Sequence, residues 1–199
     1  SPSRGLGDVY KRQVTASPGG QIATWSNGDL TATVTGLSNR NSYSFSVVAS
    51  NTAGNSISSA PSNTITPATV PGTPVNVSAT ASTAQATVTW NAPSSDGGSP
   101  LTSYTVTASP GGQSVNVTGS ANTATFTGLS NGTSYTFTVT ATNAKGDSSA
   151  SSASSAVTPA TVPGAPTNVS ATAGNTQATV TWNAPSSTGG SVSYTHLRA

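Results

Sequence analysis

Apolar and polar residues alternate along several short stretches of this chain, and the clearest stretch begins at Tyr135. Phe137, Val139 and Ala141 follow it at every second position, with threonines between them. A period of two residues places the apolar groups on one face of a strand and the threonines on the other. A turn rich in Gly, Asn and Ser precedes the stretch, at residues 128–133. The pattern predicts a half-buried β-strand.

The same alternation predicts strands throughout the middle of the chain. The expected strands cover about residues 75–80, 86–90, 104–108, 115–117 and 124–126, then the strand that begins at Tyr135, and a last one that ends near Val157. A domain of this length buries only about 60 to 65% of its unfolded surface, so a few large side chains must form its core. The expected core residues are Trp90, Tyr104, Phe126, Leu129, Tyr135 and Phe137.

Long segments of the sequence repeat. Val14–Gln21 recurs unchanged as Val106–Gln113, and Trp90 recurs as Trp182, which sets a period of 92 residues. This period is long enough for one small sandwich domain per repeat.

Two proline-rich segments, residues 66–74 and 158–166, separate the copies, and they should be extended and fairly stiff. We expect a partial copy without its first strands at 14–69, a complete domain at 70–161, and a partial copy with only two strands at 162–191.

Both ends of the chain have a different character. Residues 3–13 and 192–199 correspond to the two strands of a transposase sequencing adaptor translated in frame. We therefore expect residues 1–13 and 192–199 to be adaptor-derived and exclude them from fold reasoning. The sequence contains no methionine, and we expect it to be a fragment from inside a longer reading frame.

Removing the ends changes the charge. The formal net charge of the whole chain is +2. The segment between the ends has two basic residues, Arg40 and Lys145, and three acidic ones, Asp29, Asp96 and Asp147. Because binding to phosphates needs clustered Lys and Arg, the sequence predicts no nucleic-acid partner. No apolar run is long enough to predict a membrane-spanning helix.

The order of these features resembles a fibronectin type III domain. Trp90 stands on the second of seven short strands, Tyr104 on the third, and Leu129 and Tyr135 flank the turn before the sixth. The resemblance implies an all-β fold, an immunoglobulin-like antiparallel sandwich of two sheets in tandem repeats, with Tyr135 in a tyrosine corner. Its neutral Ser- and Thr-rich faces are similar to repeats of bacterial secreted enzymes and surface proteins, which implies an extracellular or cell-surface location.

Candidate catalytic groups are scarce. Acid–base catalysis usually needs a His or a pair of tuned carboxylates. Residues 14–191 include no His, Cys or Glu, and their three Asp residues stand in different turns. A calcium site needs six or more oxygen ligands, more than Asp96 and Asp147 would supply. We therefore expect no enzymatic activity, no cofactor and no metal site.

Two weak binding candidates stand outside the expected core. Lys145, Gly146 and Asp147 match a variant of the Arg-Gly-Asp adhesion signal, with a solvated turn as the alternative. Trp25 has Val117 as its counterpart in the middle copy, and it is either an exposed aromatic that could stack on a sugar or a partly buried strand residue.

The sequence therefore predicts a monomeric, non-catalytic extracellular spacer or interaction module. The alternative is a carbohydrate- or surface-binding accessory of a secreted polysaccharide-degrading enzyme. The partner would be a polysaccharide or a surface protein.

Overall fold

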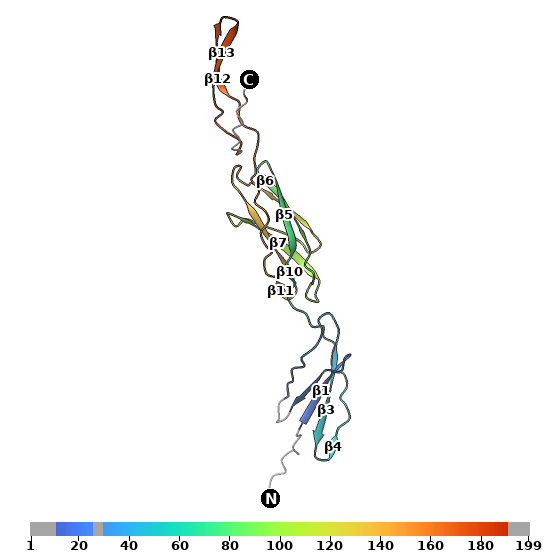
Figure 1. Ribbon diagram of the computed structural model, residues 1–199. Helices are drawn as coiled ribbons and strands as arrows, with labels where there is room; N and C mark the ends of the chain where they lie inside the picture. Colours follow the sequence, from blue (N-terminus) through green and yellow to red (C-terminus); the bar gives the residue numbers. More distant parts are fainter. Residues whose placement is uncertain (1–10, 26–29, 191–199) are drawn as a thin grey trace. The chain divides into compact units, whose positions relative to one another are not determined.

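The computed structural model describes residues 11–25 and 30–190, and each regular element among them is a β-strand (Figure 1). The chain divides into two compact units, one of residues 1–70 with 97–99 and one of residues 71–96 with 100–199. Most of the predicted adaptor residues, 1–10 and 192–199, lie outside the described residues, as does Asp29.

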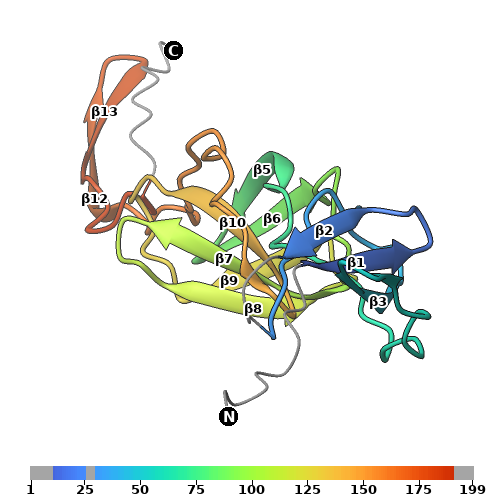
Figure 2. The ribbon, with the colours of Figure 1, turned by 90° about the horizontal axis from the view of Figure 1, so that it is seen from below.

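The second unit contains a sandwich of two antiparallel sheets (Figure 2). One sheet has the strand order β5-β6-β9, and the other has the order β11-β10-β7-β8. The predicted all-β antiparallel sandwich is confirmed. The strands of the first sheet are β5 (Val75–Ser82), β6 (Gln85–Asn91) and β9 (Thr123–Thr127), and those of the second are β7 (Leu101–Ser109), β8 (Ser114–Thr118), β10 (Thr136–Asn143) and β11 (Gly146–Asp147).

The alternation in the sequence becomes an alternation in burial. Along β6, Ala86, Val88 and Trp90 are buried while the residues between them are exposed. The same alternation places Phe137 and Val139 of β10 inside the sandwich, both fully buried. Side chains of the two inner faces then meet across the gap between the sheets.

Aromatic pairs join the two sheets. The ring centroids of Trp90 and Tyr104 lie 5.3 Å apart, and those of Phe126 and Phe137 lie 4.9 Å apart, with tilted ring planes in both pairs. Such tilted contacts are favoured by the ring quadrupoles. The structure places all six predicted core residues in one buried cluster, which also includes Val88, Val106, Val139, Ala86, Ala108, Ala124 and Ala141.

Two tyrosine corners close the turns before β3 (Ser44–Asn51) and β10. The Ser130 N–H donates to Tyr135 Oη at 3.2 Å, and the Ser38 N–H donates to Tyr43 Oη at 3.0 Å. Each bond joins residues five positions apart, so a buried phenol satisfies a backbone donor of its own turn.

The last segment of the sandwich corrects one prediction. The sequence predicts an ordinary strand ending near Val157, but residues 148–156 form no regular strand, and Val157 forms only an isolated bridge with Tyr135. Ser148, Ser151 and Ser154 donate their main-chain N–H groups to alternate carbonyls of β10. Three residues of this segment therefore span two residues of β10, so it is wound more tightly than a strand, at roughly 2.3 Å per residue.

Serine hydroxyls complete this unusual pairing. Each of the three serines is buried, accepts a hydrogen bond from a β10 N–H and donates one to the carbonyl of the next residue. The acceptor–donor pairs are Ser148 Oγ with Ala141 N at 3.0 Å, Ser151 Oγ with Val139 N at 2.9 Å and Ser154 Oγ with Phe137 N at 3.1 Å. We call residues 148–156 the serine segment; it leaves the edge of β10 hydrogen-bonded.

The first unit has a single sheet in the described part of the chain. Its strand order, β2-β1-β3-β4, has the same connectivity as β8-β7-β10-β11. A second serine segment, at residues 56–62, bonds to β3 through Ser56, Ser59 and Ser62. The strands are β1 (Lys11–Ser17), β2 (Ile22–Trp25), β3 and β4 (Gly54–Asn55). Strand β1 thus begins three residues before the predicted boundary at Val14; backbone pairing there does not depend on the origin of the side chains.

A two-stranded hairpin follows the sandwich. It consists of β12 (Thr167–Gly174) and β13 (Gln177–Asn183). The sequence of β13, Gln-Ala-Thr-Val-Thr-Trp-Asn, is identical to that of β6. Trp90 of β6 is 3% exposed, whereas Trp182 of β13 is 60% exposed. The same strand is therefore covered in one place and uncovered in the other.

This pair of identical strands offers a matched stability test. Trp90→Ala should destabilise the sandwich by about 3–5 kcal/mol, because it removes a buried ring and leaves a cavity. Trp182→Ala should leave the sandwich unchanged, since its ring is mostly exposed. Urea unfolding of the full-length variants measures both, and equal effects of the two substitutions would contradict the core assignment.

The serine segment offers a second test. Ser151→Ala removes the acceptor of the buried Val139 N–H and should cost about 1–3 kcal/mol. Ser152→Ala is the matched control, because the neighbouring hydroxyl is exposed. Thermal unfolding gives the melting temperature of both variants. Equal melting temperatures would show that the hydrogen bond from the Val139 N–H to Ser151 Oγ does not stabilise the domain.

Candidate binding sites

The loops that follow β6 and β10 meet at one end of the sandwich. Asn143, which is 4% exposed, joins them. Its Nδ2 donates to the carbonyl of Asp96 at 2.7 Å, and its Oδ1 accepts from the N–H of Lys145 at 2.7 Å. A buried amide therefore fixes the backbone of both loops at this end.

The candidate adhesion tripeptide belongs to a tight hairpin: Lys145 lies in the turn after β10, and Gly146 and Asp147 form β11. Gly146 pairs with Asn143, and Asp147 pairs with Thr142. Gly146 has φ of 125°, a conformation that residues with a Cβ rarely adopt. Asp147 Oδ1 accepts a hydrogen bond from Thr142 Oγ1 at 2.6 Å. The side chains of Lys145 and Asp147 are exposed, but the turn is short and its carboxylate already has a hydroxyl partner.

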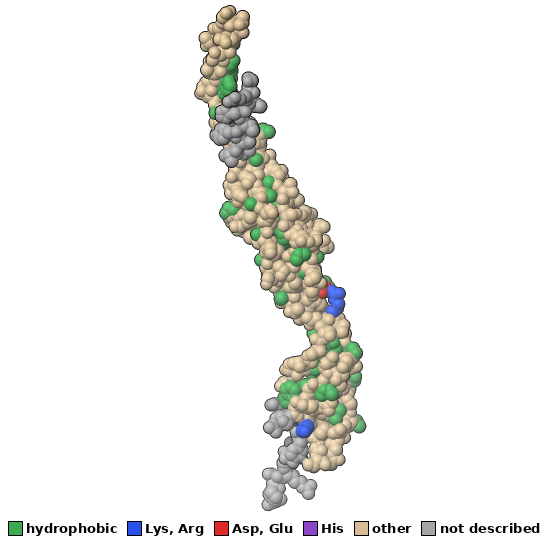
Figure 3. Space-filling view, in the orientation of Figure 1, with side chains coloured by type: hydrophobic (Ala, Val, Ile, Leu, Met, Phe, Trp, Pro, Cys, Tyr) green, Lys and Arg blue, Asp and Glu red, His purple; other side chains and the backbone are tan. Residues whose placement is uncertain are grey.

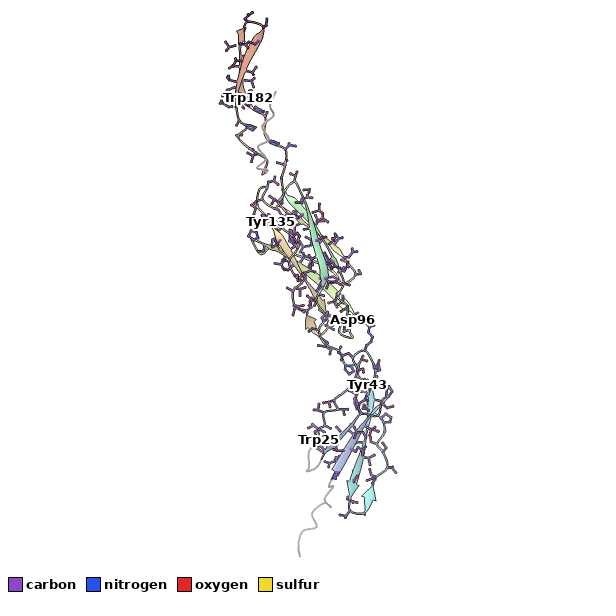
Figure 4. All side chains as sticks on the ribbon, viewed as in Figure 1. Trp25, Tyr43, Asp96, Tyr135 and Trp182 are labelled. Carbon is purple, nitrogen blue, oxygen red and sulfur yellow. The ribbon has the colours of Figure 1, made fainter. Side chains whose placement is uncertain are left out.

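The described aspartates do not assemble a metal site. Asp96 is half-buried and lies in the loop after β6, at the position labelled in Figure 4. Among residues 11–25 and 30–190, no group of three or more His, Cys, Asp or Glu side chains comes together.

Trp25 lies at the end of β2 and lines a hollow of about 630 Å³ on the apolar face of the first unit (Figure 4). Its side chain is half-buried, so the structure places it between the two alternatives of the sequence analysis. Arg12, opposite Trp25 in the β1–β2 pairing, also lines the hollow. The arrangement resembles an open core more than a flat stacking platform.

Two buried tyrosines have shifted acidities. Burial raises the pKa of Tyr104 above its ordinary value of 10.0, and this exceeds the opposing influence of the Trp90 side chain. Trp90 Nε1 has no hydrogen-bond partner of good geometry in the described structure, so ring contact joins these two residues. The Ser38 N–H, which donates to the phenol oxygen of Tyr43, lowers the pKa of that tyrosine.

Sequence reasoning missed two features of the sandwich. One is the serine segment, which bonds to the edge of β10, and the other is Asn143, which joins the two loops at one end. The serine segments are visible afterwards as serines at every third position, a period that belongs neither to a helix nor to a strand. The role of Asn143 had no local signal, because the amide bonds to a loop 47 residues earlier in the chain.

The geometry agrees with the comparison to known families. Residues 71–158 match the family described as the fibronectin type III domain.

These residues form a fibronectin type III domain.

The match covers both sheets and the serine segment of the sandwich, and it excludes residues 1–70 and the hairpin.

Known relatives resemble parts of the chain. Chitinase A1 of Niallia circulans is 38% identical over 142 residues, which cover 66% of this chain and 19% of the chitinase. The chain thus spans about a fifth of the length of that relative. No helix in the described residues is long and apolar enough to cross a membrane.

Two solved structures are also similar. A crystal structure of titin domains superposes with a TM-score of 0.49 at 27% identity, over 73% of this chain and 53% of that one. The titin kinase with its flanking domains gives a TM-score of 0.41 at 32% identity, over 46% and 18%. Because neither TM-score reaches 0.5, the fold assignment rests on the family match and the sheet topology.

The raised pKa of Tyr104 predicts a loss of stability in alkali. The folded domain keeps the phenol proton at a pH where the unfolded chain has lost it. The stabilising contribution is therefore complete below about pH 10 and is lost as the pH rises through the higher folded-state value. Tyr104→Phe should unfold with a smaller decrease in free energy above pH 10 than the parent. Parallel alkaline profiles would contradict the burial argument.

Proposed function

We propose that the chain is a non-catalytic extracellular spacer built from tandem fibronectin type III repeats. In this proposal residues 14–69 and 162–191 are partial copies on either side of the complete domain. The shared strand order of the first unit and the identity of β6 and β13 support this. Such a module separates other parts of a longer protein.

The observation that carries the spacer proposal is the closure of the domain at residues 71–158. Its apolar side chains are inside, and its outward strand positions are mostly Thr, Ser and Asn. A domain that is complete in itself can hold neighbours apart without binding a ligand of its own.

Main-chain bonds in the proline-rich junctions give further support. Within the first unit the Thr69 N–H donates to the Gly97 carbonyl, and the equivalent pair 92 residues later is Thr161 with Gly189. Within the second unit Gly72 bonds in the same way to Ser95, as Gly164 does to Ser187. Bonded junctions restrict the conformations of a linker, which suits a stiff spacer.

The alternative is a carbohydrate-binding accessory of a secreted polysaccharide-degrading enzyme. Two observations favour it: the relative is a chitinase, and Trp25 lines an apolar hollow. An aromatic ring in a hollow could stack on a sugar. In this alternative the partner is a polysaccharide such as chitin.

Sedimentation with insoluble polysaccharide separates the two functions. The full chain is mixed with chitin or with cellulose, and the protein left in the supernatant is measured. A spacer should remain there in full. Binding that Trp25→Ala abolishes and that Trp182→Ala leaves intact would replace the spacer proposal by the carbohydrate-binding one.

A further inference from the structure

The dipeptide Gly-Gly occurs at four places in the chain, and its surroundings differ between them. Residues 19–20 and 111–112 are exposed and lie in the turns of the hairpins β1–β2 and β7–β8. Residues 97–98 and 189–190 lie in the loops after β6 and β13, where the first glycine of each pair is buried. Every glycine of the four pairs has a positive φ, which accounts for glycine at each place. Burial distinguishes the two pairs in the loops.

Main-chain atoms surround the glycines of the loop after β13. A Cβ on Gly189 would overlap the carbonyl oxygen of Thr161, and a Cβ on Gly190 would overlap the main-chain nitrogen of Gly132. A Cβ on either glycine of the pair 111–112 would meet no atom within 4 Å. Hard-sphere repulsion therefore excludes other residues from the loop in its observed position, whereas the exposed hairpin turn has no such restriction.

The surface that receives this loop belongs to the complete domain. It consists of residues 130–132, in the turn that Tyr135 closes (Figure 4), and residues 159–161 of the proline-rich junction; we call it the docking surface. Three hydrogen bonds hold its two segments to each other and to the β5–β6 turn. They join the Gly132 N–H to the Pro159 carbonyl at 2.8 Å, the Ala84 N–H to Asn131 Oδ1 at 2.8 Å and Thr83 Oγ1 to the Ala160 carbonyl at 3.1 Å. The docking surface is therefore preorganised.

Hydrogen bonds between main-chain groups hold the loop in place. The Thr161 N–H donates to the Gly189 carbonyl at 2.8 Å, and the Gly164 N–H donates to the Ser187 carbonyl at 2.9 Å. Neither the loop at residues 187–190 nor the docking surface has a charged residue. The visible face of the sandwich likewise consists mostly of backbone and uncharged polar side chains (Figure 3). Shape and main-chain hydrogen bonds therefore determine this contact.

The same arrangement occurs 92 residues earlier, within the first unit, which includes residues 97–99. The Thr69 N–H donates to the Gly97 carbonyl at 2.9 Å, and a Cβ on Gly98 would lie 2.9 Å from the main-chain nitrogen of Arg40. The Arg40 N–H donates to the Pro67 carbonyl at 3.1 Å, as its counterpart does in the second unit. Two loops thus make the same contact with two equivalent surfaces.

We propose that the docking surface is a binding site for a Gly-Gly loop and that its partner is the loop after the second strand of the following repeat. The contact fixes each repeat to the one before it, so the proline-rich junction between them cannot bend freely. Because the junction is short, the partner is present at a high effective concentration. This inference rests on the proposed tandem spacer and explains how that spacer becomes stiff.

Amide hydrogen exchange in the full chain tests the binding site. Gly189→Ala places a Cβ against the Thr161 carbonyl, so the Thr161 N–H should lose its acceptor and exchange more than about tenfold faster. Gly111→Ala is the matched control, because it also has a positive φ, of 99°, but open space around it. The Val139 N–H, inside the sandwich, is the reference for global stability. Unchanged exchange of Thr161 in Gly189→Ala, or equal acceleration in both variants, would overturn the proposal.

Gly132→Arg tests whether the need for glycine belongs to the loop rather than to the docking surface. Arg40 occupies the equivalent position of the first unit, with φ of 73°, and the contact forms there. The variant should therefore keep the Thr161 N–H protected. Exchange as fast as in Gly189→Ala would contradict the assignment of the glycine requirement to the loop.

Relaxation of ¹⁵N nuclei measures whether the contact stiffens the junction. In the parent, the amides of β13 should share the rotational correlation time of the amides of β6. In Gly189→Ala the β13 amides should tumble faster, and those of β6 should be unchanged. Independent tumbling of β13 in the parent would reject the binding site. Binding to chitin with shared tumbling would instead reject the spacer and retain the binding site, so the two failures are distinguishable.

Discussion

Each sheet of this protein has one apolar face, and covering that face is the constraint on which the rest of the structure depends. In the complete domain the two sheets cover each other, and the contact of Trp90 with Tyr104 joins their inner faces. The hydrophobic effect is roughly proportional to the apolar area removed from water. Strands whose apolar side chains are buried when two sheets pack together therefore expose those side chains to water when no second sheet covers them. Identical residues therefore give a 3% exposed Trp90 and a 60% exposed Trp182.

The edge of the second sheet shows how backbone groups are satisfied once the faces are covered. A regular strand would pair with β10 residue by residue, but the serine segment has an extra residue in every step, as in a repeated β-bulge. Such a step would leave N–H groups of β10 without carbonyl acceptors, and buried donors without partners are costly. Serine hydroxyls at every third position supply those acceptors, so the sequence period of three and the bonding pattern have one cause.

The period of two was enough to predict the sandwich, because burial on one face of a strand is a local consequence of alternation. It was also enough to locate Trp90, Phe126 and Phe137, which lie in the core. The prediction of a regular last strand was wrong because serines at every third position match the periodicity of neither a strand nor a helix. The link between the loops through Asn143 depends on residues far apart in the sequence, and no local pattern encodes it.

Near-identical repeats carry a consequence of their own. Strand β6 and strand β13 have the same seven residues, so side-chain chemistry alone cannot determine which sheet each should cover. In a covalent array, chain order supplies this information, since a strand is close to its own sheet at a high effective concentration. Where that order leaves a face open, the same chemistry favours a strand from elsewhere, as in the exchange of elements between neighbouring repeats. Identical repeats therefore make strand pairing less specific, and the order of the strands along the chain determines which sheet each strand joins.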